Sequence, residues 1–251
     1  FEALWMVNMV CGEYGEGKMS EPVEIVKKIN DHFQKIKNNK KLKAIVTAGP
    51  TREYIDPVRF ISNESSGKQG YEIANSLNNN GFETTLISGP SNLKISPEIN
   101  LIKVDSAQAM YEATIGNLPA DIAIFTAAVA DWKIKNYQKN KIKNKDNLNL
   151  DLEKNVDILK HVSNHNSLRP KLVIGFSAET ENIERNSVNK LKDKNCDWII
   201  SNDVSDKTIG FGSDYNEVTI FYKNKQSEII SKMKKTLLAD AIVERAVAAL
   251  N

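Results

Sequence analysis

The residues best placed to do chemistry follow the first strand-like run of a predicted α/β domain, in TAGPTREYIDPVRFISNESSGKQG at positions 47–70. Glycine and small polar residues are frequent in this stretch, and small side chains let backbone N–H groups approach a ligand closely. Its end coincides with the expected start of a helix, and helix N-termini attract anions. The candidate phosphate or substrate contacts there are Ser65, Ser66, Gly67 and Lys68. Because the stretch matches neither GxxxxGK[ST] nor a GxGxxG directly after a strand, an ordinary helix cap explains it about equally well.

Two arginines and an asparagine in the same stretch have a functional and a structural interpretation. Arg52 or Arg59 could hold a carboxylate or phosphate through paired hydrogen bonds. A surface salt bridge to Glu53 or Asp56 is the alternative, and it would contribute little. Asn63 could bind substrate, although its position favours capping of the following helix.

Further candidates lie at the ends of two predicted strands, in AAVADW at 127–132 and GFSAET at 175–180. Asp131 could hydrogen-bond a nucleotide or, as a weak metal candidate, hold Mg²⁺, but a turn cap is equally compatible. Phe176 could stack on a base or pack in the core, and Glu179 could bind a ligand or face solvent. The three histidines form no spaced set, so neither a catalytic triad nor a metal cluster is predicted.

A lysine-rich segment at 132–154 follows the strand that carries AAVADW. Its lysines stand at 133, 135, 139, 141, 143 and 145. Composition alone predicts a solvated loop. Its place after the carboxyl end of a strand favours a lid, because ligands of open α/β sheets bind at that edge.

The elements that must position these residues alternate between strand and helix from Leu42 onwards. Predicted strands cover 43–48, 83–88, 100–104, 121–127, 171–176 and 197–201, with an edge strand at 217–223. Predicted helices cover 68–80, 106–117, 157–166 and 182–195, with a last helix from about 232 to 250. This alternation predicts an α/β, Rossmann-like, mostly parallel sheet with helices on both faces and a long lysine-rich lid loop. Ahead of it, residues 20–36 read as a helix and 37–41 as a linker.

Composition excludes several function classes. Lysine plus arginine total 34 against 32 acidic residues, so the net charge of +2 predicts no nucleic-acid partner. The apolar runs are too short to span a membrane, and no signal peptide is visible. Two widely separated cysteines make neither a disulfide framework nor a zinc site. We therefore expect a cytoplasmic protein.

Several of these blocks, in order and spacing, resemble the phosphopantothenoylcysteine synthetase family. They are the stretch at 47–70, AAVADW, KIK at 141–143, EKNVDIL at 153–159, GFSAET, and SNDV at 201–204. The resemblance implies a synthetase domain over 42–251 and ligation of 4′-phosphopantothenate to L-cysteine in coenzyme A biosynthesis. It also implies CTP with Mg²⁺, an acyl-cytidylate intermediate and a homodimer.

The resemblance also implies roles for individual residues. It makes Asn63 the holder of the acyl-cytidylate, Arg59 a residue of the second half-reaction, and Lys141 the essential lysine of the lid, with Lys143 a further substrate candidate. The implied nucleotide contacts are Phe125, Thr126, Ala127, Asp131, Lys141, Val156, Asp157, Ile158, Leu159, Phe176, Lys190 and Lys194. Two positions depart from the family pattern, because Asn144 replaces a lid lysine and Val156 replaces a proline.

The stretch VCGEYGEGKMSEP at 10–22 is similar to the end of the flavin-dependent decarboxylase that is often fused ahead of this family. The similarity implies that residues 1–36 are a decarboxylase remnant with Cys11 as its catalytic cysteine. FMN would then belong to a missing domain, and this chain would not decarboxylate.

Two other function classes stay open at the sequence level. A Rossmann-type oxidoreductase would need a GxGxxG turn and an acidic residue ending the second strand, but that strand ends in ISGP at 87–90. A non-catalytic binding module is the second alternative. The presence of Asn63, Arg59 and Lys141 argues against it, and the departure at Asn144 keeps it open.

Overall fold

The computed structural model describes residues 4–8, 14–19, 21–28, 41–143, 148–203 and 213–250. The chain divides into two compact units, residues 1–41 and 42–251. In the first unit, β1 (Leu4–Asn8) pairs antiparallel with β2 (Tyr14–Met19), and residues 22–28 are helical. The predicted helix at 20–36 is thus confirmed over 22–28. Cys11 and most of the predicted linker lie outside the described residues.

The second unit is built on an eight-stranded sheet with the order β14-β13-β12-β11-β8-β3-β6-β7. The six strands from β12 to β7 run parallel, whereas β13 and β14 add an antiparallel edge. The sheet confirms the predicted mostly parallel α/β architecture. Its strands are β3 (Lys43–Ala48), β6 (Glu83–Ser88), β7 (Asn100–Lys103), β8 (Ile122–Phe125), β11 (Leu172–Glu179), β12 (Trp198–Asp203), β13 (Tyr215–Tyr222) and β14 (Ser227–Lys234).

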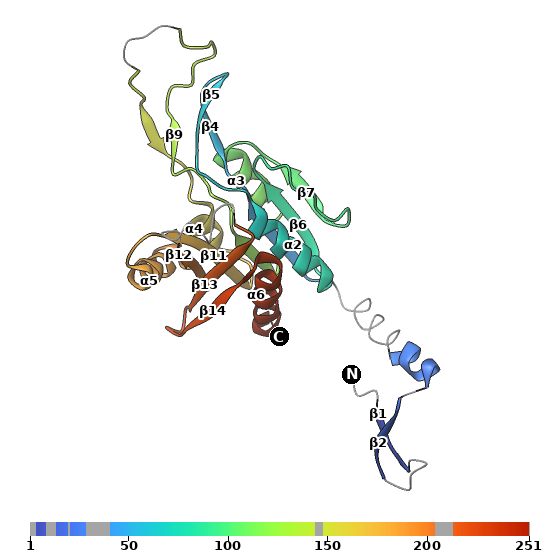
Figure 1. Ribbon diagram of the computed structural model, residues 1–251. Coiled ribbons are helices and arrows are strands. Elements are labelled where there is room, and N and C mark those ends of the chain that lie inside the picture. Colours follow the sequence, from blue (N-terminus) through green and yellow to red (C-terminus); the bar gives the residue numbers. More distant parts are fainter. Residues whose placement is uncertain are drawn as a thin grey trace. The chain divides into compact units, whose positions relative to one another are not determined.

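Helices cover both faces of this sheet (Figure 1). One hydrophobic cluster joins α2 (Lys68–Asn79) and α6 (Lys235–Leu250) to one face, and a second joins α3 (Ala107–Gly116), α4 (Ile158–Ser163) and α5 (Ile183–Lys194) to the other. Neighbouring residues of β3 point to opposite faces of the sheet, because Val46 belongs to the first cluster and Ile45 to the second. Burial on both faces explains why the central strands are continuous apolar runs.

The parallel strands follow the order of a dinucleotide-binding sheet. From β3 the chain moves outwards through β6 to β7, then returns to the other side of β3 with β8, β11 and β12. The order therefore reverses between β3 and β8, and the loops that leave these two strands diverge. Ligands of open α/β sheets bind in the crevice that this divergence creates.

Two short antiparallel strand pairs, which the sequence analysis did not predict, are the main difference from the predicted elements. The glycine- and serine-rich stretch contains the hairpin of β4 (Arg52–Asp56) and β5 (Arg59–Ser62). The lysine-rich segment is closed at its base by β9 (Trp132–Ile134) and β10 (Leu152–Lys154). β4 packs against β9, and the two strand pairs form an arm that projects from the sheet (Figure 1). Residues 227–234, partly predicted as helix, form β14 instead.

Among the described residues, none of the helices combines the length and the apolar character that a membrane span requires.

Candidate active site

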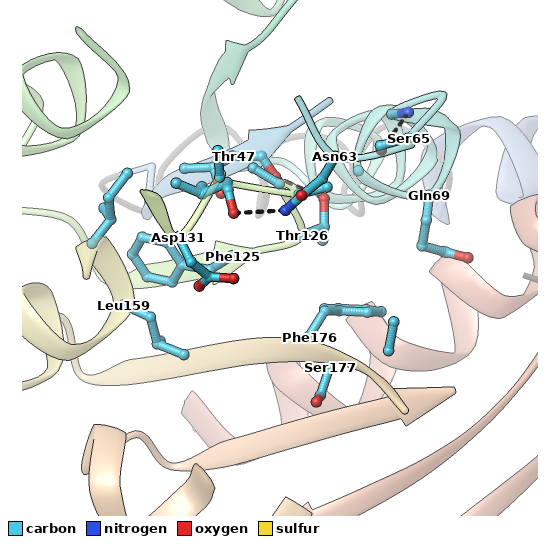
Figure 2. A pocket seen from close by; sticks show the side chains of 18 of the residues that line it. Thr47, Asn63, Ser65, Gln69, Phe125, Thr126, Asp131, Leu159, Phe176 and Ser177 are labelled. Atoms are coloured by element: carbon cyan, nitrogen blue, oxygen red, sulfur yellow. Dashed lines mark hydrogen bonds between the residues drawn. The ribbon is translucent and has the colours of Figure 1, made fainter. Parts of the chain in front are cut away.

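A cavity of about 990 Å³ opens where the carboxyl ends of β3, β8 and β11 meet. Its walls are residues 62–70, 125–132, 154–159 and 176–178, together with side chains from β3, α5, β12, β13 and α6. Figure 2 shows Asn63 and Thr126 on one side of the cavity and Phe176 on the other. The cavity therefore occupies the crevice that the strand order predicts.

Most of the sequence-predicted site residues line this cavity. They are Asn63, Ser65, Ser66, Gly67, Lys68, Phe125, Thr126, Ala127, Asp131, Val156, Asp157, Ile158, Leu159, Phe176, Lys190 and Lys194. Five described candidates lie outside that lining: Arg52, Arg59, Lys141, Lys143 and Glu179.

The N-terminus of α2 forms one end of the cavity. The helix begins after Gly67, whose φ of 75° is a left-handed conformation that glycine adopts without strain. Ser65 Oγ accepts a hydrogen bond from the N–H of Gly67 over 3.2 Å, and Ser66 Oγ accepts one from the N–H of Lys68, the first residue of the helix, over 3.4 Å. The first turn lies directly against the end of β3 and the residue that follows β8, because a Cβ at Gly70 would be 2.3 Å from Thr126 Oγ1 and 2.6 Å from Ala48 Cβ. The positive end of the helix dipole is thus held at the cavity.

Asn63 bridges the two loops that diverge at the strand reversal. Its Nδ2 donates a hydrogen bond of 3.0 Å to the carbonyl oxygen of Val129, drawn as a dashed line in Figure 2. The side chain is exposed and lies on the cavity wall. Because this amide donates to Val129 and the N-cap position of α2 is Gly67, the interpretation of Asn63 as a helix cap is wrong.

Two lysines of α5 face the cavity, and each has a carboxylate partner. Lys190 Nζ lies 2.6 Å from Glu179 Oε1. Lys194 Nζ donates to Asp157, which also caps α4. Burial lowers the pKa of Lys194, but Asp157 outweighs this effect and the pKa is raised overall. The positive charge on this wall is therefore largely compensated.

The opposite end carries two further lysines beside the start of α2. Lys68 Nζ lies 2.5 Å from Asp214 Oδ1, and Lys68 holds the pKa of that carboxyl below its usual range. Lys235 lines the cavity with only 5% of its surface exposed. Burial lowers the pKa of Lys235, and the nearby charge of Lys68 lowers it further. An anion bound here would relieve both effects.

Apolar side chains form the middle of the cavity. Phe176 is half-buried. It packs against the α2–α6 cluster, as the core interpretation predicted, and it also lines the cavity, where it could contact a base. Phe125 is 7% exposed and belongs to the core of the other face. Figure 2 places Phe125 and Leu159 near each other across from Phe176. Such a surface suits the flat face of a base or a ribose ring.

Arg59 and Lys141 come together on the arm. Arg59 forms an ion pair of 3.3 Å with Asp56, a partner that the structural alternative named, but the Asp56 carboxylate is buried and the pair is not the predicted surface salt bridge. Its Nη2 also donates to the carbonyl oxygen of Ile142, while the N–H of Ile142 donates to Asp56 Oδ2, both over 3.2 Å. Burial raises the pKa of Asp56, but backbone hydrogen bonds from Val58, Ile142 and Arg59 outweigh it and lower the pKa. Both backbone polar groups of Ile142 are thus fixed, with Lys141 and Lys143 exposed on either side.

Asp131 is exposed on the cavity wall, and its backbone oxygen accepts the N–H of Asn155 over 2.9 Å. Within the described ranges, no group of three or more histidine, cysteine, aspartate or glutamate side chains is arranged to hold a metal. Asp131 could supply one ligand to Mg²⁺, which usually takes only one or two carboxylates when it binds beside substrate phosphates.

Sequence reasoning missed several residues of the cavity. Asn155 and Asn202 lie within motifs that carry the resemblance, so a signal was present but no role followed from it. Asn216 and Lys235 come from β13 and α6, far along the chain, and no spacing pattern ties them to residues 62–70.

Comparison with known proteins assigns the family. Residues 39–250 match the model of the DNA/pantothenate metabolism flavoprotein C-terminal domain. The chain belongs to this family. It is 42% identical over 236 residues to the coenzyme A biosynthesis bifunctional protein CoaBC of Haemophilus influenzae. The aligned region covers 93% of this chain and 58% of that protein. The chain thus spans about three-fifths of the length of this relative.

Solved structures give the family the same fold. The C-terminal domain of CoaBC matches with a TM-score of 0.69 and 37% identity, over 84% of this chain and 96% of that one. A Cab2 mutant in complex with phosphopantothenate-cysteine matches with a TM-score of 0.66 and 16% identity, over 92% and 94% of the two chains, and this likeness concerns the fold alone.

One part of the predicted resemblance is wrong. The matched family model and the matched solved domain are both C-terminal domains, so the chain is that domain and not a remnant of a decarboxylase. The assignment of residues 1–36 to a decarboxylase, with Cys11 as its catalytic residue, is withdrawn. It rested on a short glycine-rich stretch, which is too little sequence to identify a domain.

Proposed function

We propose that this domain is a ligase of coenzyme A biosynthesis that joins 4′-phosphopantothenate to L-cysteine and uses CTP to activate the carboxylate. The observation that carries the proposal is the cavity at the strand reversal, with a helix N-terminus and two lysines at one end and apolar side chains in its middle. The relatives are named for coenzyme A biosynthesis, and a protein of this fold is named in complex with phosphopantothenate-cysteine.

The reaction that fits has two steps. A carboxylate oxygen of 4′-phosphopantothenate attacks the α-phosphorus of CTP, and pyrophosphate leaves with the bonding electron pair. The amine of cysteine then attacks the acyl carbon of the mixed anhydride, loses a proton and expels CMP. Both transition states concentrate negative charge, so positioned cations and N–H groups supply most of the catalysis.

The charges of the cavity favour one orientation of the nucleotide. The lysines of α5 are paired with Glu179 and Asp157, and Lys68 is paired with Asp214, but the α2 end also presents a helix N-terminus beside the buried Lys235. We therefore place the phosphates at α2 and the base and ribose beside Phe176 and α5. Bound Mg²⁺ would neutralise phosphate charge, and Asp131 is the cavity residue that fits as its ligand.

The residues implied by the resemblance are assigned as follows. The amide of Asn63 already donates a hydrogen bond to the carbonyl oxygen of Val129 at the cavity wall. The same N–H group could instead donate to the acyl-cytidylate. Lys141 and Arg59 lie on the arm outside the cavity lining, so they would act only after the arm closes or from a second subunit. A homodimer would supply that second arm. FMN-dependent decarboxylation is a proposal for a longer parent protein, whose relatives are named bifunctional.

The decisive test is pyrophosphate release with CTP, 4′-phosphopantothenate and Mg²⁺, followed by product formation when cysteine is added. We expect release that requires the pantothenate substrate, and far faster turnover with CTP than with ATP at matched low concentrations. Equal rates with both nucleotides would refute the choice of CTP. Binding of CTP without any release would favour a non-catalytic binding module, and hydride transfer to a nicotinamide would favour an oxidoreductase.

A further inference from the structure

Glu179 is a buried carboxylate at the end of β11, next to the wall that α5 contributes to the cavity. Only 9% of its surface is exposed, so the interpretation of Glu179 as a solvent-facing residue is wrong. Its Oε1 accepts hydrogen bonds from Ser177 Oγ and from Lys190 Nζ, and its Oε2 accepts one of 3.2 Å from Asn186 Nδ2.

A buried carboxylate requires such partners, because losing water costs far more than one ordinary hydrogen bond returns. Burial raises the pKa of Glu179, but the hydrogen bond and charge of Lys190 outweigh it, and the pKa is lowered overall. Glu179 is therefore an ionised group with a fixed orientation. Ser177 lies two residues earlier on the same face of β11 and also accepts from Lys190 Nζ, over 2.7 Å.

Lys190 gains a defined position from this arrangement. Its side chain is 45% exposed, and a lysine with four rotatable bonds would otherwise sample many rotamers. Two acceptors on one strand hold its ammonium group at the cavity wall. The remaining donor capacity of the ammonium group can serve a ligand.

The attachment of α5 to the sheet does not depend on Glu179. Ser187 Oγ and Ser201 Oγ lie 2.6 Å apart between α5 and β12, and Leu191 is buried in the cluster on that face. The Glu179 network is thus additional to the contacts that anchor the helix, which favours a role in the site over a role in packing.

From this geometry we propose that Glu179 is a positioning residue, which holds Lys190 and the hydroxyl of Ser177 where the base and ribose of the nucleotide bind. The inference rests on the proposed function, because it takes the cavity to be a nucleotide site. Glu179 itself acts through Lys190 and does not touch the nucleotide.

A double-mutant cycle on nucleotide affinity tests this role. The variants are Glu179→Gln, Lys190→Met and the pair together, with Glu181→Gln as the matched control, because Glu181 is an exposed glutamate two residues further along the chain. Each is measured for Kd of CTP, for KM and kcat of pyrophosphate release, and for Tm. Ser177→Ala, which removes the other acceptor, keeps the test informative if Glu179→Gln fails to fold.

We expect Glu179→Gln to weaken CTP binding roughly tenfold, as for the loss of one charge-assisted contact, with kcat nearly unchanged. The double variant should bind CTP no worse than Lys190→Met alone, because the two residues act in series. Glu181→Gln should match the wild type.

Two results would overturn the inference. One is wild-type CTP affinity in Glu179→Gln, or in Ser177→Ala if the former does not fold. The other is a strictly additive cycle accompanied by a fall in Tm, which is the signature of a packing residue. A wild-type chain that neither binds nor turns over CTP would instead refute the proposed function, and this inference with it.

Discussion

At the scale of single residues, Asn63 is the side chain whose two interpretations the structure separates most clearly. It does not cap α2, and it links the loops after β3 and β8 through Val129. A neutral donor at this place suits a ligand whose phosphate groups are already negative. Replacement by a carboxylate would remove the donor and add like charge.

We therefore expect Asn63→Asp to abolish most product formation while the fold survives. Two unit charges about 4 Å apart repel by about 4 kcal/mol at an effective dielectric of 20, which corresponds to a loss of at least about a hundredfold. Because Asn63 is exposed, the free energy of unfolding should change by less than about 1 kcal/mol. Cysteine-dependent product and thermal melting measure the two effects. Asn79→Asp, the same change at an exposed position late in α2, is the control, and equal activity of both variants would contradict the role of Asn63.

The sequence predicted which residue types meet at the cavity better than it predicted what each side chain does. Residues that follow parallel strands reach one edge of the sheet wherever the strands occur in the fold, so Asn63, Asp131 and Phe176 could be grouped from spacing alone. Arg59 shows the limit, because the sequence named Asp56 as a possible partner, but the contact of Arg59 with Ile142 depends on an arm that no periodicity indicated.

At the scale of elements, the close approach of α2 to the sheet is what brings its N-terminus to the cavity. Gly70 makes that approach possible, because a side chain there would collide with Thr126 and Ala48. Gly116, at the end of α3, has nothing within 4 Å of the same ideal Cβ position. The two glycines therefore form a matched pair for testing the approach.

Gly70→Ala should destabilise the protein and weaken nucleotide binding together. Overpacking of this kind costs about 1–3 kcal/mol, which lowers Tm by roughly 2–12 °C in a domain of this size. Moving α2 outwards would also raise KM for CTP. Gly116→Ala should leave KM unchanged and keep or raise Tm, because alanine favours a helix by up to about 1 kcal/mol over glycine. If both variants changed KM for CTP and Tm by similar amounts, the close approach of α2 to the sheet would not be what determines nucleotide binding.

The arm was the element that sequence analysis predicted least well. β5, β9 and β10 have three or four residues each, too few for an alternating pattern to emerge from the polar background. Their pairing comes from tertiary contacts, such as the hydrogen bond from the N–H of Gln138 to the carbonyl oxygen of Ile55. The long helices and buried strands were predicted closely because burial imposes their period on the sequence.

At the scale of the whole molecule, the buried core lies entirely within the second unit as the structure describes it. Both hydrophobic clusters consist of residues between Leu42 and Leu250, and they cover the two faces of one continuous sheet. The cavity is lined by residues of that unit as well. Residues 1–41 contribute a separate hairpin and a short helix.

A chain of residues 39–251 should therefore fold and act without the first unit. We expect its Tm to lie within about 4 °C of that of the full chain, since 1 kcal/mol shifts the Tm of such a domain by about 2–4 °C. Pyrophosphate release with CTP should keep its kcat and KM, because every residue of the cavity is retained. Thermal melting by circular dichroism and steady-state kinetics on both chains measure these effects. As a control, Gly116→Ala is made in each chain, and it should change the Tm of both chains by the same amount. A shorter chain that melts more than about 10 °C lower, or that folds but loses CTP turnover, would mean that the first unit supports the site directly.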